Sequence, residues 1–170
     1  MDYIELIGQG IGIVAFCLAV WSFQQNEHKK IVLFQLLANL CFATNYFMIG
    51  AYTGALLNTI GLARSIVFIF KDKKWAASNW WLVFFSLVCA AVGIYTWEGP
   101  LTLLPMSAMI LTTIAFGINN PKITRLLSFP SSPLWLVYNV VKLSWGGVLT
   151  ECFNMGSIII GMLRFDRNKK

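Results

Sequence analysis

Three polar side chains lie inside long apolar stretches of this sequence and are its first candidates for chemistry. Glu151 lies in the run from Val148 to Phe165, and Asn58 and Arg64 lie in the run from Gly54 to Phe70. A carboxylate in an apolar environment persists only if it is paired, neutralised or used in function. We therefore predict that Glu151 binds a polar solute or carries a proton. Asn58 is predicted either to contact the same solute or to hydrogen-bond between helices.

A second group of candidates follows helical spacing. Trp135, Tyr138 and Asn139 are at positions i, i+3 and i+4, which places them on one face of a helix. Such an aromatic and amide face can stack against a small polar solute and hydrogen-bond to it, or it can serve for packing alone. Asn45 and Asn154 are weaker candidates of the same kind.

Arg64 and Gly12 are candidates for structural or gating roles. Arg64 is near enough to a span end to extend its guanidinium to the membrane edge or to anchor an inner gate. Small residues around Gly12 favour close packing of helices.

Enzyme chemistry is not expected. The one histidine, His28, lies in a charged segment and is predicted to be a solvated loop residue. The four cysteines lie in apolar runs without a CxxC pattern or a nearby histidine, so they are predicted to be packing residues and no metal or cofactor is expected. No nucleophile can be matched with a base.

The composition indicates what kind of protein must position these residues. Of 170 residues, 58% are hydrophobic and only 12% are charged. A soluble domain carries about 25% charged residues, so this chain is predicted to be an integral membrane protein rather than a secreted, nuclear or disordered one. The net charge of +6 comes from short clusters between apolar runs. This placement is typical of membrane edges, and no nucleic-acid partner is expected.

Apolar runs and their punctuation predict seven transmembrane helices in one domain, residues 1–170. A membrane core about 30 Å thick needs about 20 helical residues. Glycine near Gly50 and the Gly99-Pro100 pair divide the runs, and Asn119-Asn120-Pro121 ends the fifth helix. Pro130 and Pro133 predict a kink in the sixth. The predicted spans are Leu6–Gln24, Ile31–Ile49, Gly54–Phe70, Trp80–Trp97, Leu101–Ile118, Leu126–Val141 and Val148–Phe165.

Basic residues predict the orientation. Eleven of the thirteen lie on one side of the predicted spans, whereas Asp2, Glu5 and Glu98 lie on the other side together with Lys142. The positive-inside rule then predicts an N-terminus outside and a C-terminus in the cytoplasm.

The chain also matches itself at an offset of 93 residues. Phe23 falls on Phe116, Phe42 on Trp135, and Asn58 on Glu151. We therefore predict two parallel three-helix repeats, residues 6–70 and 101–165, joined by a linker helix over residues 80–97. With a rise of 1.5 Å per residue, Asn58 and Glu151 lie about 18 Å and about 21 Å from the predicted cytoplasmic ends of their helices. Both are predicted to face one central cavity, because repeat interfaces often hold transporter sites.

Several motifs in this order resemble the YgjV family of bacterial inner-membrane proteins, and the resemblance covers nearly the whole chain. It implies a location in the bacterial inner membrane but names no substrate. The motifs are Gln9-Gly10-Ile11-Gly12-Ile13-Val14-Ala15-Phe16, Leu57-Asn58 with Arg64, Leu104-Pro105, Trp135-x-x-Tyr138-Asn139, Gly146-Gly147, Glu151 and Arg164.

The three-plus-one-plus-three plan is more distantly similar to the SWEET and PQ-loop sugar transporters. That resemblance implies a solute-facing Asn on the third helix of each repeat, which Asn58 matches in the first repeat. In the second repeat, the equivalent position is occupied by Glu151, and Asn154 lies one helical turn later. It also implies a hinge proline on the first helix of each repeat. Pro105 matches this position in the second repeat, whereas the first repeat has Gly12 there. The chain has no Pro-Gln dipeptide.

These observations predict an all-α membrane protein that moves a small polar solute across the bilayer by alternating access. The alternative is a receptor, sensor or assembly module that uses the same bundle without transport. The expected partners are the lipid bilayer, an unidentified small polar solute and, in an oligomer, further copies of the chain.

Overall fold

The computed structural model describes residues 3–167, and these residues are helical with no β-strand among them. Asp2, Lys169 and Lys170, which contribute to the predicted orientation, lie outside the described residues. The 3₁₀ turn η1 precedes α5, and the π-helical turn η2 continues α8. The elements are α1 (Tyr3–Ser22), α2 (His28–Met48), α3 (Tyr52–Ile69), α4 (Trp80–Tyr95), η1 (Pro100–Thr102), α5 (Leu103–Gly117), α6 (Pro121–Ser128), α7 (Ser131–Val141), α8 (Trp145–Gly161) and η2 (Met162–Asp166).

Five helical segments are long and apolar enough to cross a membrane, so the predicted all-α membrane class is confirmed. The remaining apolar helix, α4, has 16 residues and is shorter than these five. The five segments are Tyr3–Ser22, His28–Met48, Tyr52–Ile69, Pro100–Gly117 and Trp145–Asp166.

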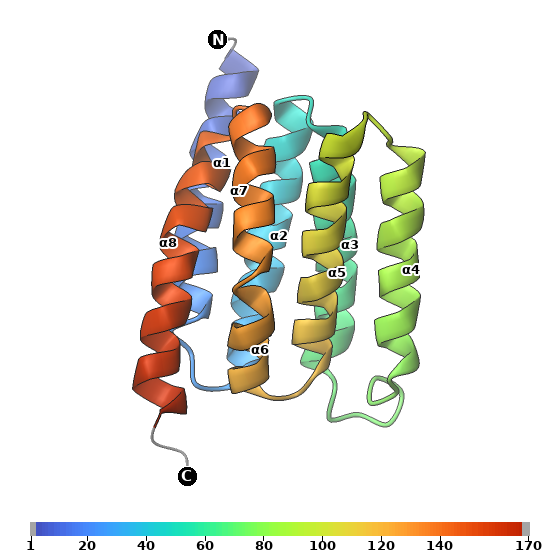
Figure 1. The fold of residues 1–170 in the computed structure, drawn as a ribbon, viewed down its shortest axis with the longest axis vertical. Helices are drawn as coiled ribbons and strands as arrows, with labels where there is room; N and C mark the ends of the chain where they lie inside the picture. Colours follow the sequence, from blue (N-terminus) through green and yellow to red (C-terminus); the bar gives the residue numbers. More distant parts are fainter. Residues whose placement is uncertain (1–2, 168–170) are drawn as a thin grey trace.

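The helices are arranged in two layers of three (Figure 1). In one layer α2 packs between α1 and α3, and in the other α7, with α6 below it, packs between α5 and α8. The layers meet where α1 packs against α8 and α3 packs against α5. The helix α4 lies at one edge of the bundle, against α3 and α5. The space between the two layers is therefore bordered by α1–α3 and α5–α8 and not by α4.

The two ends of the bundle are named here by the chain ends nearest to them. The N-terminal end holds the start of α1 and the α2–α3 and α7–α8 connections, and the C-terminal end holds η2 and the α1–α2 and α5–α6 connections (Figure 1).

Glycine forms the turn that was predicted between α2 and α3. Gly50 has φ of 71°, a left-handed conformation that glycine adopts without strain. The next amide, the N–H of Ala51, donates to the carbonyl of Tyr46 at 2.8 Å and closes the end of α2. The predicted division of the long apolar run is thus confirmed.

The helix predicted over Leu126–Val141 is wrong in its start, and the kink predicted in it is a break between two helices, α6 and α7. Helix α6 begins five residues earlier, at Pro121, because Oδ1 of Asn120 accepts from the amides of Lys122 and Ile123 and caps it. The chain then breaks at Phe129-Pro130, where proline has no amide hydrogen to continue the ladder. Pro133 lies in the first turn of α7, where no donor is required.

The prediction that His28 is a solvated loop residue is wrong. His28 begins α2 and is buried, with Nε2 at 3.0 Å from the carbonyl oxygen of Phe116. The short connection after Ser22 brings the start of α2 against the C-terminal end of α5, where water is excluded.

Candidate functional site

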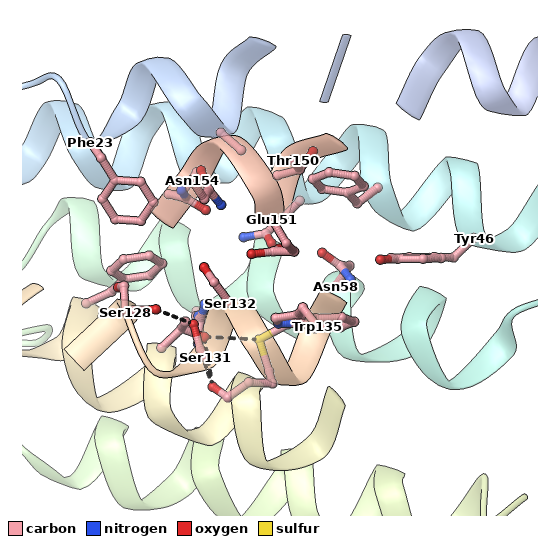
Figure 2. A pocket seen from close by; sticks show the side chains of 18 residues that line it. Phe23, Tyr46, Asn58, Ser128, Ser131, Ser132, Trp135, Thr150, Glu151 and Asn154 are labelled. Carbon is pink, nitrogen blue, oxygen red and sulfur yellow. Dashed lines mark hydrogen bonds between the residues drawn. The ribbon is translucent and has the colours of Figure 1, made fainter. Parts of the chain in front are cut away.

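A cavity of about 60 Å³ lies between the two helical layers. Each helix of the two layers contributes residues to its lining. In the described part of the chain, no residue of α4 lines it. Figure 2 shows these side chains converging from both layers. The lining residues are Ala19, Phe23, Gln35, Asn39, Phe42, Tyr46, Asn58, Arg64, Met109, Thr112, Phe116, Ser128, Ser131, Ser132, Trp135, Thr150, Glu151 and Asn154.

Glu151 is the one acidic residue among them. Its side chain projects from α8 and is only 8% exposed. The hydroxyl of Ser132 and the carboxamide of Asn154 approach its carboxylate (Figure 2). Among residues 3–167, no lysine or arginine lies within the 4.0 Å that defines an ion pair with this group. The carboxyl group therefore faces the cavity with hydrogen-bonding neighbours but without a counter-charge.

Asn58 lines the same cavity from α3. Its Nδ2 donates to the carbonyl of Gly54, one turn earlier, at 2.9 Å. No described residue donates to its Oδ1, which leaves this oxygen as the acceptor available to a solute. The structure therefore brings Asn58 and Glu151 to one cavity, as the repeat predicted.

The side chain of Arg64 is buried between helices, so the prediction that it extends outward to the membrane edge is wrong. Only 1% of the residue is exposed, and Nη1 donates to the carbonyl of Met109 at 3.0 Å and to the hydroxyls of Thr112 and Thr113. The guanidinium carbon lies 5.0 Å from the centre of the Phe116 ring. The side chain turns inward because α5 offers it three oxygen acceptors and an aromatic face. It has no anionic partner among the described residues.

Four buried polar atoms around the cavity have no hydrogen-bond partner in the described part of the chain. They are Asn39 Nδ2, Arg64 Nε, Ser128 Oγ and Asn154 Oδ1, and all four residues line the cavity. Buried polar groups without partners are costly, and in native proteins they are usually satisfied by water or a ligand. The cavity is thus built for polar contents.

The lining of the cavity follows the 93-residue offset closely. Twelve of its eighteen residues form six pairs in which the second number exceeds the first by 93. A two-fold relation between the layers would produce this result, because equivalent residues would face the common space from opposite sides. The pairs are Ala19 with Thr112, Phe23 with Phe116, Gln35 with Ser128, Asn39 with Ser132, Phe42 with Trp135, and Asn58 with Glu151.

Four of these lining residues, Gln35, Asn39, Ser128 and Ser132, are polar residues that sequence reasoning missed. They are uncharged, so they do not stand out in their predicted spans as Glu151 and Arg64 do. The repeat could have found them, since the offset of 93 pairs a polar residue with a polar residue in both cases.

Of the three residues predicted to form one face of α7, one lines the cavity and two do not. Trp135 lines the cavity and stacks on Tyr46, with ring centres 6.0 Å apart. Tyr138 and Asn139 are buried but do not line it. The hydroxyl of Tyr46 donates to Oδ1 of Asn139, and the amide of Gly54 donates to the Tyr138 hydroxyl at 2.9 Å. These contacts join α2 and α3 to α7 on the side of the cavity nearer the N-terminal end of the bundle.

Asn45, Gly12 and Pro105 lie away from the cavity. Asn45 donates to the carbonyl of Gly8 at 2.8 Å and accepts from Ser144 at 3.0 Å, which ties α1, α2 and α8 together. Gly12 packs directly on the backbone of Gly146. Pro105 is buried in the first turn of α5, just after η1.

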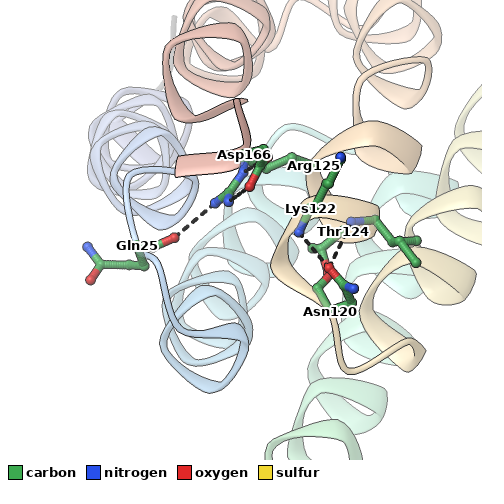
Figure 3. A network of polar contacts seen from close by, with 7 residues as sticks. Gln25, Asn120, Lys122, Thr124, Arg125 and Asp166 are labelled. Atoms are coloured by element: carbon green, nitrogen blue, oxygen red, sulfur yellow. Dashed lines mark hydrogen bonds and ion pairs between the residues drawn. The ribbon is translucent and has the colours of Figure 1, made fainter. Parts of the chain in front are cut away.

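The C-terminal end of the bundle is closed by a buried ion pair (Figure 3). Arg125 donates from Nε and Nη2 to the two carboxylate oxygens of Asp166, at 2.9 and 2.6 Å. Its Nη1 donates to the carbonyl of Gln25 at 3.0 Å. These three contacts join α6, η2 and the α1–α2 connection. Arg125 was predicted only as one of the cytoplasmic charges, and burial could not be read from its position in a basic cluster.

Within residues 3–167, no group of three or more His, Cys, Asp or Glu side chains is placed to hold a metal ion. The four cysteines are free thiols.

Comparison with known proteins agrees with this description. Residues 6–169 match the family model described as Imp-YgjV, bacterial inner membrane protein. The chain is similar to the inner membrane protein YgjV of Escherichia coli (strain K12), with 21% identity over 168 residues that cover 96% of this chain and 87% of the relative. No solved structure matches the chain at a significant level. The chain, with its layered apolar helices and the polar cavity between them, therefore belongs to the YgjV family of bacterial inner membrane proteins.

Proposed function

We propose that this protein carries a small polar solute across the bacterial inner membrane by alternating access around the cavity between its two helical layers. The observation that carries the proposal is the polar cavity between the layers, which is lined by Glu151 and by four residues with unpartnered polar atoms, Arg64 among them, in a largely apolar bundle. Charged and polar residues at membrane depth usually mark a solute or proton pathway.

The proposal includes seven membrane crossings in a three-plus-one-plus-three plan. Helix α4 is 16 residues long and extends for about 24 Å, and residues 121–141 of α6 and α7 together extend for about 32 Å. Both lengths are comparable with a membrane core of about 30 Å. The position of α4 at the edge and the six residue pairs around the cavity support a linker helix between two parallel repeats.

The proposed orientation has the N-terminal end of the bundle outside and the C-terminal end in the cytoplasm. Its support is the distribution of basic residues along the chain, because Lys73-Lys74 lies in the α3–α4 connection and Lys29-Lys30 in the first turn of α2, both at the C-terminal end. Arg125 and Asp166 would then close the cavity on the cytoplasmic side, and Tyr46 and Asn139 would close it on the outside.

In the proposal, contacts near the two ends of the bundle act as the gates. Alternating access requires each gate to open in turn while the other holds. The contacts that must separate are few and side-chain-mediated, Tyr46 with Asn139 at one end and Arg125 with Asp166 and Gln25 at the other.

Thiol accessibility tests the proposal without knowledge of the solute. The native cysteines Cys17, Cys41, Cys89 and Cys152 are replaced by alanine, and Asn58→Cys is introduced as a single reporter in the cavity. A membrane-impermeant maleimide is applied to right-side-out and inside-out vesicles separately. Alternating access predicts labelling from both sides. Ala55→Cys is the control, because Ala55 is fully buried on the same helix but does not line the cavity.

The other function carried from the sequence, a receptor, sensor or assembly module, predicts a different result. A module that does not transport would expose Asn58→Cys to one side at most. Labelling from a single side, or none while the protein is folded, would overturn the proposed transport. The proposal involves no catalytic step.

A further inference from the structure

The charges around the cavity differ in sign and are not paired with each other. Glu151 projects from α8 and Arg64 from α3, and both line the cavity. Neither forms an ion pair within 4.0 Å in the described part of the chain. A buried charge without a counter-charge is strongly unfavourable. The cavity therefore has a basic region at Arg64, called here the positive region, and an acidic region at Glu151, called here the negative region.

Hydrogen-bond donors without partners gather near the positive region. Arg64 has a free Nε, and Asn39 has a free Nδ2. The two are close, because the Asn39 side chain packs on Gly61, one helical turn before Arg64, where an added Cβ would lie 3.1 Å from it. Two adjacent donors, one of them charged, suit a carboxylate group.

Acceptors gather near the negative region. Asn154 follows Glu151 by three positions on α8, and its Oδ1 has no partner. The Oδ1 of Asn58 also accepts no bond from the described residues, and Figure 2 shows Asn58 and Asn154 on either side of Glu151. A carboxylate with two amide oxygens suits an ammonium group, which has three N–H donors and no acceptor.

The volume limits the size of the ligand. A cavity of about 60 Å³ holds about four to six groups of water size, at about 10–15 Å³ for each. Glycine has five non-hydrogen atoms and alanine has six. From this juxtaposition of donors and acceptors we infer that the cavity binds a compact zwitterion with one ammonium and one carboxylate group, of the size of glycine or L-alanine. The inference rests on the proposed function and adds the class of solute to it.

Other classes of small solute leave part of the site uncompensated. A neutral polyol satisfies hydrogen bonds but neither charge. A simple amine compensates Glu151 alone, and a simple carboxylate compensates Arg64 alone. A zwitterion compensates both at once.

Binding to purified protein in nanodiscs tests this inference, with titration calorimetry as the measurement. The probes are glycine, L-alanine, methylamine, acetate and glycerol. We expect glycine or L-alanine to bind most tightly to the wild type. Glu151→Gln should weaken glycine binding by about tenfold or more, since it removes a charged hydrogen-bond partner. The same variant should improve acetate binding, because Arg64 then acts alone.

Two further variants keep the test independent of the folding of Glu151→Gln. Asn39→Leu removes the free donor beside Arg64 and should weaken glycine and acetate binding while leaving methylamine binding unchanged. Ser65→Ala is the matched control, because Ser65 is buried next to Arg64 in the chain but does not line the cavity. Its binding of all five probes should equal that of the wild type.

The outcomes separate this inference from the proposed function. Tightest binding of glycerol, acetate or methylamine, or no binding of any probe, would overturn the zwitterion inference and leave transport to be judged by thiol accessibility. Glycine binding that depends on Glu151, with no uptake of labelled glycine into proteoliposomes, would support the zwitterion site and count against transport.

Discussion

The hydroxyl of Tyr46 on α2 donates a hydrogen bond to Oδ1 of Asn139 on α7, and these two residues are 93 positions apart. The same offset relates the six residue pairs around the cavity. Residues equivalent under a two-fold axis touch one another only when they lie close to that axis. In the proposed repeat, the axis therefore passes between α2 and α7, and this hydrogen bond is the proposed gate at one end of the cavity.

Tyr46→Phe should destabilise the closed cavity. The change leaves Asn139 Oδ1 buried without its donor, which costs about 1–3 kcal/mol. We expect a lower unfolding temperature and faster maleimide labelling of Asn58→Cys from the outside. Tyr95→Phe is the control, because Tyr95 is 87% exposed at the end of α4. Equal labelling rates in Tyr46→Phe and the control would contradict a closing role for the hydroxyl.

Gly146→Ala should disrupt the contact between α1 and α8. A Cβ at position 146 would lie 2.5 Å from the backbone carbon of Gly12, so one helix must move. We expect a loss of about 1–3 kcal/mol in stability, measured by thermal unfolding in detergent. Gly156→Ala on the same helix meets no atom within 4 Å and should be neutral or stabilising, by up to about 1 kcal/mol. A similar effect of both substitutions would mean that α1 and α8 do not pack this closely.

Glu151→Gln should fold at least as stably as the wild type and lose uptake. The substitution keeps the shape and hydrogen-bonding capacity of the side chain but removes a buried charge that has no counter-ion. Unfolding temperature and solute uptake into proteoliposomes are the two measurements. Glu27→Gln, which alters an exposed carboxylate paired with Lys30, should change neither. Full uptake by Glu151→Gln would show that the carboxylate is structural.

Arg125→Met should be among the most destabilising changes at the C-terminal end. It leaves the mostly buried carboxylate of Asp166 without its bidentate partner, and breaking a buried pair costs about 3–5 kcal/mol. The double variant with Asp166→Asn should recover part of this loss. Lys30→Met is the control, because its exposed pair with Glu27 contributes about 1 kcal/mol or less. Strictly additive single effects would show that Arg125 and Asp166 act independently.

The N-terminus is expected outside the cell membrane and the C-terminus in the cytoplasm. Alkaline phosphatase is active only when exported, and green fluorescent protein is fluorescent only when cytoplasmic. A C-terminal fluorescent protein fusion should therefore fluoresce, and a C-terminal phosphatase fusion should be inactive. An N-terminal single-cysteine tag should react with an impermeant maleimide in intact spheroplasts. Both ends on the same side would rule out an odd number of crossings, and with it the parallel repeat.

The amino-acid sequence by itself determined the class of the protein and the positions of most helices. Long apolar runs have one stable form in a bilayer, since a helix satisfies its backbone hydrogen bonds within itself. Gly50 and Pro130 mark breaks because their backbone requirements are local. The family could also be recognised, because its motifs occur in order along the chain. The 93-residue offset was also visible in the sequence. It led to the prediction that Asn58 and Glu151 face one cavity.

Only the tertiary structure decided where the polar side chains go. Arg64 turns inward because Met109, Thr112 and Thr113, more than 40 positions later, supply its acceptors. His28 is buried by Phe116, and Arg125 is paired with Asp166 across 41 positions. Burial of a polar side chain depends on which neighbours can satisfy its hydrogen bonds, and those neighbours come from other helices. The local sequence shows that burial of such a group is unfavourable. The hydrogen bonds that compensate for this burial form only when the helices pack together.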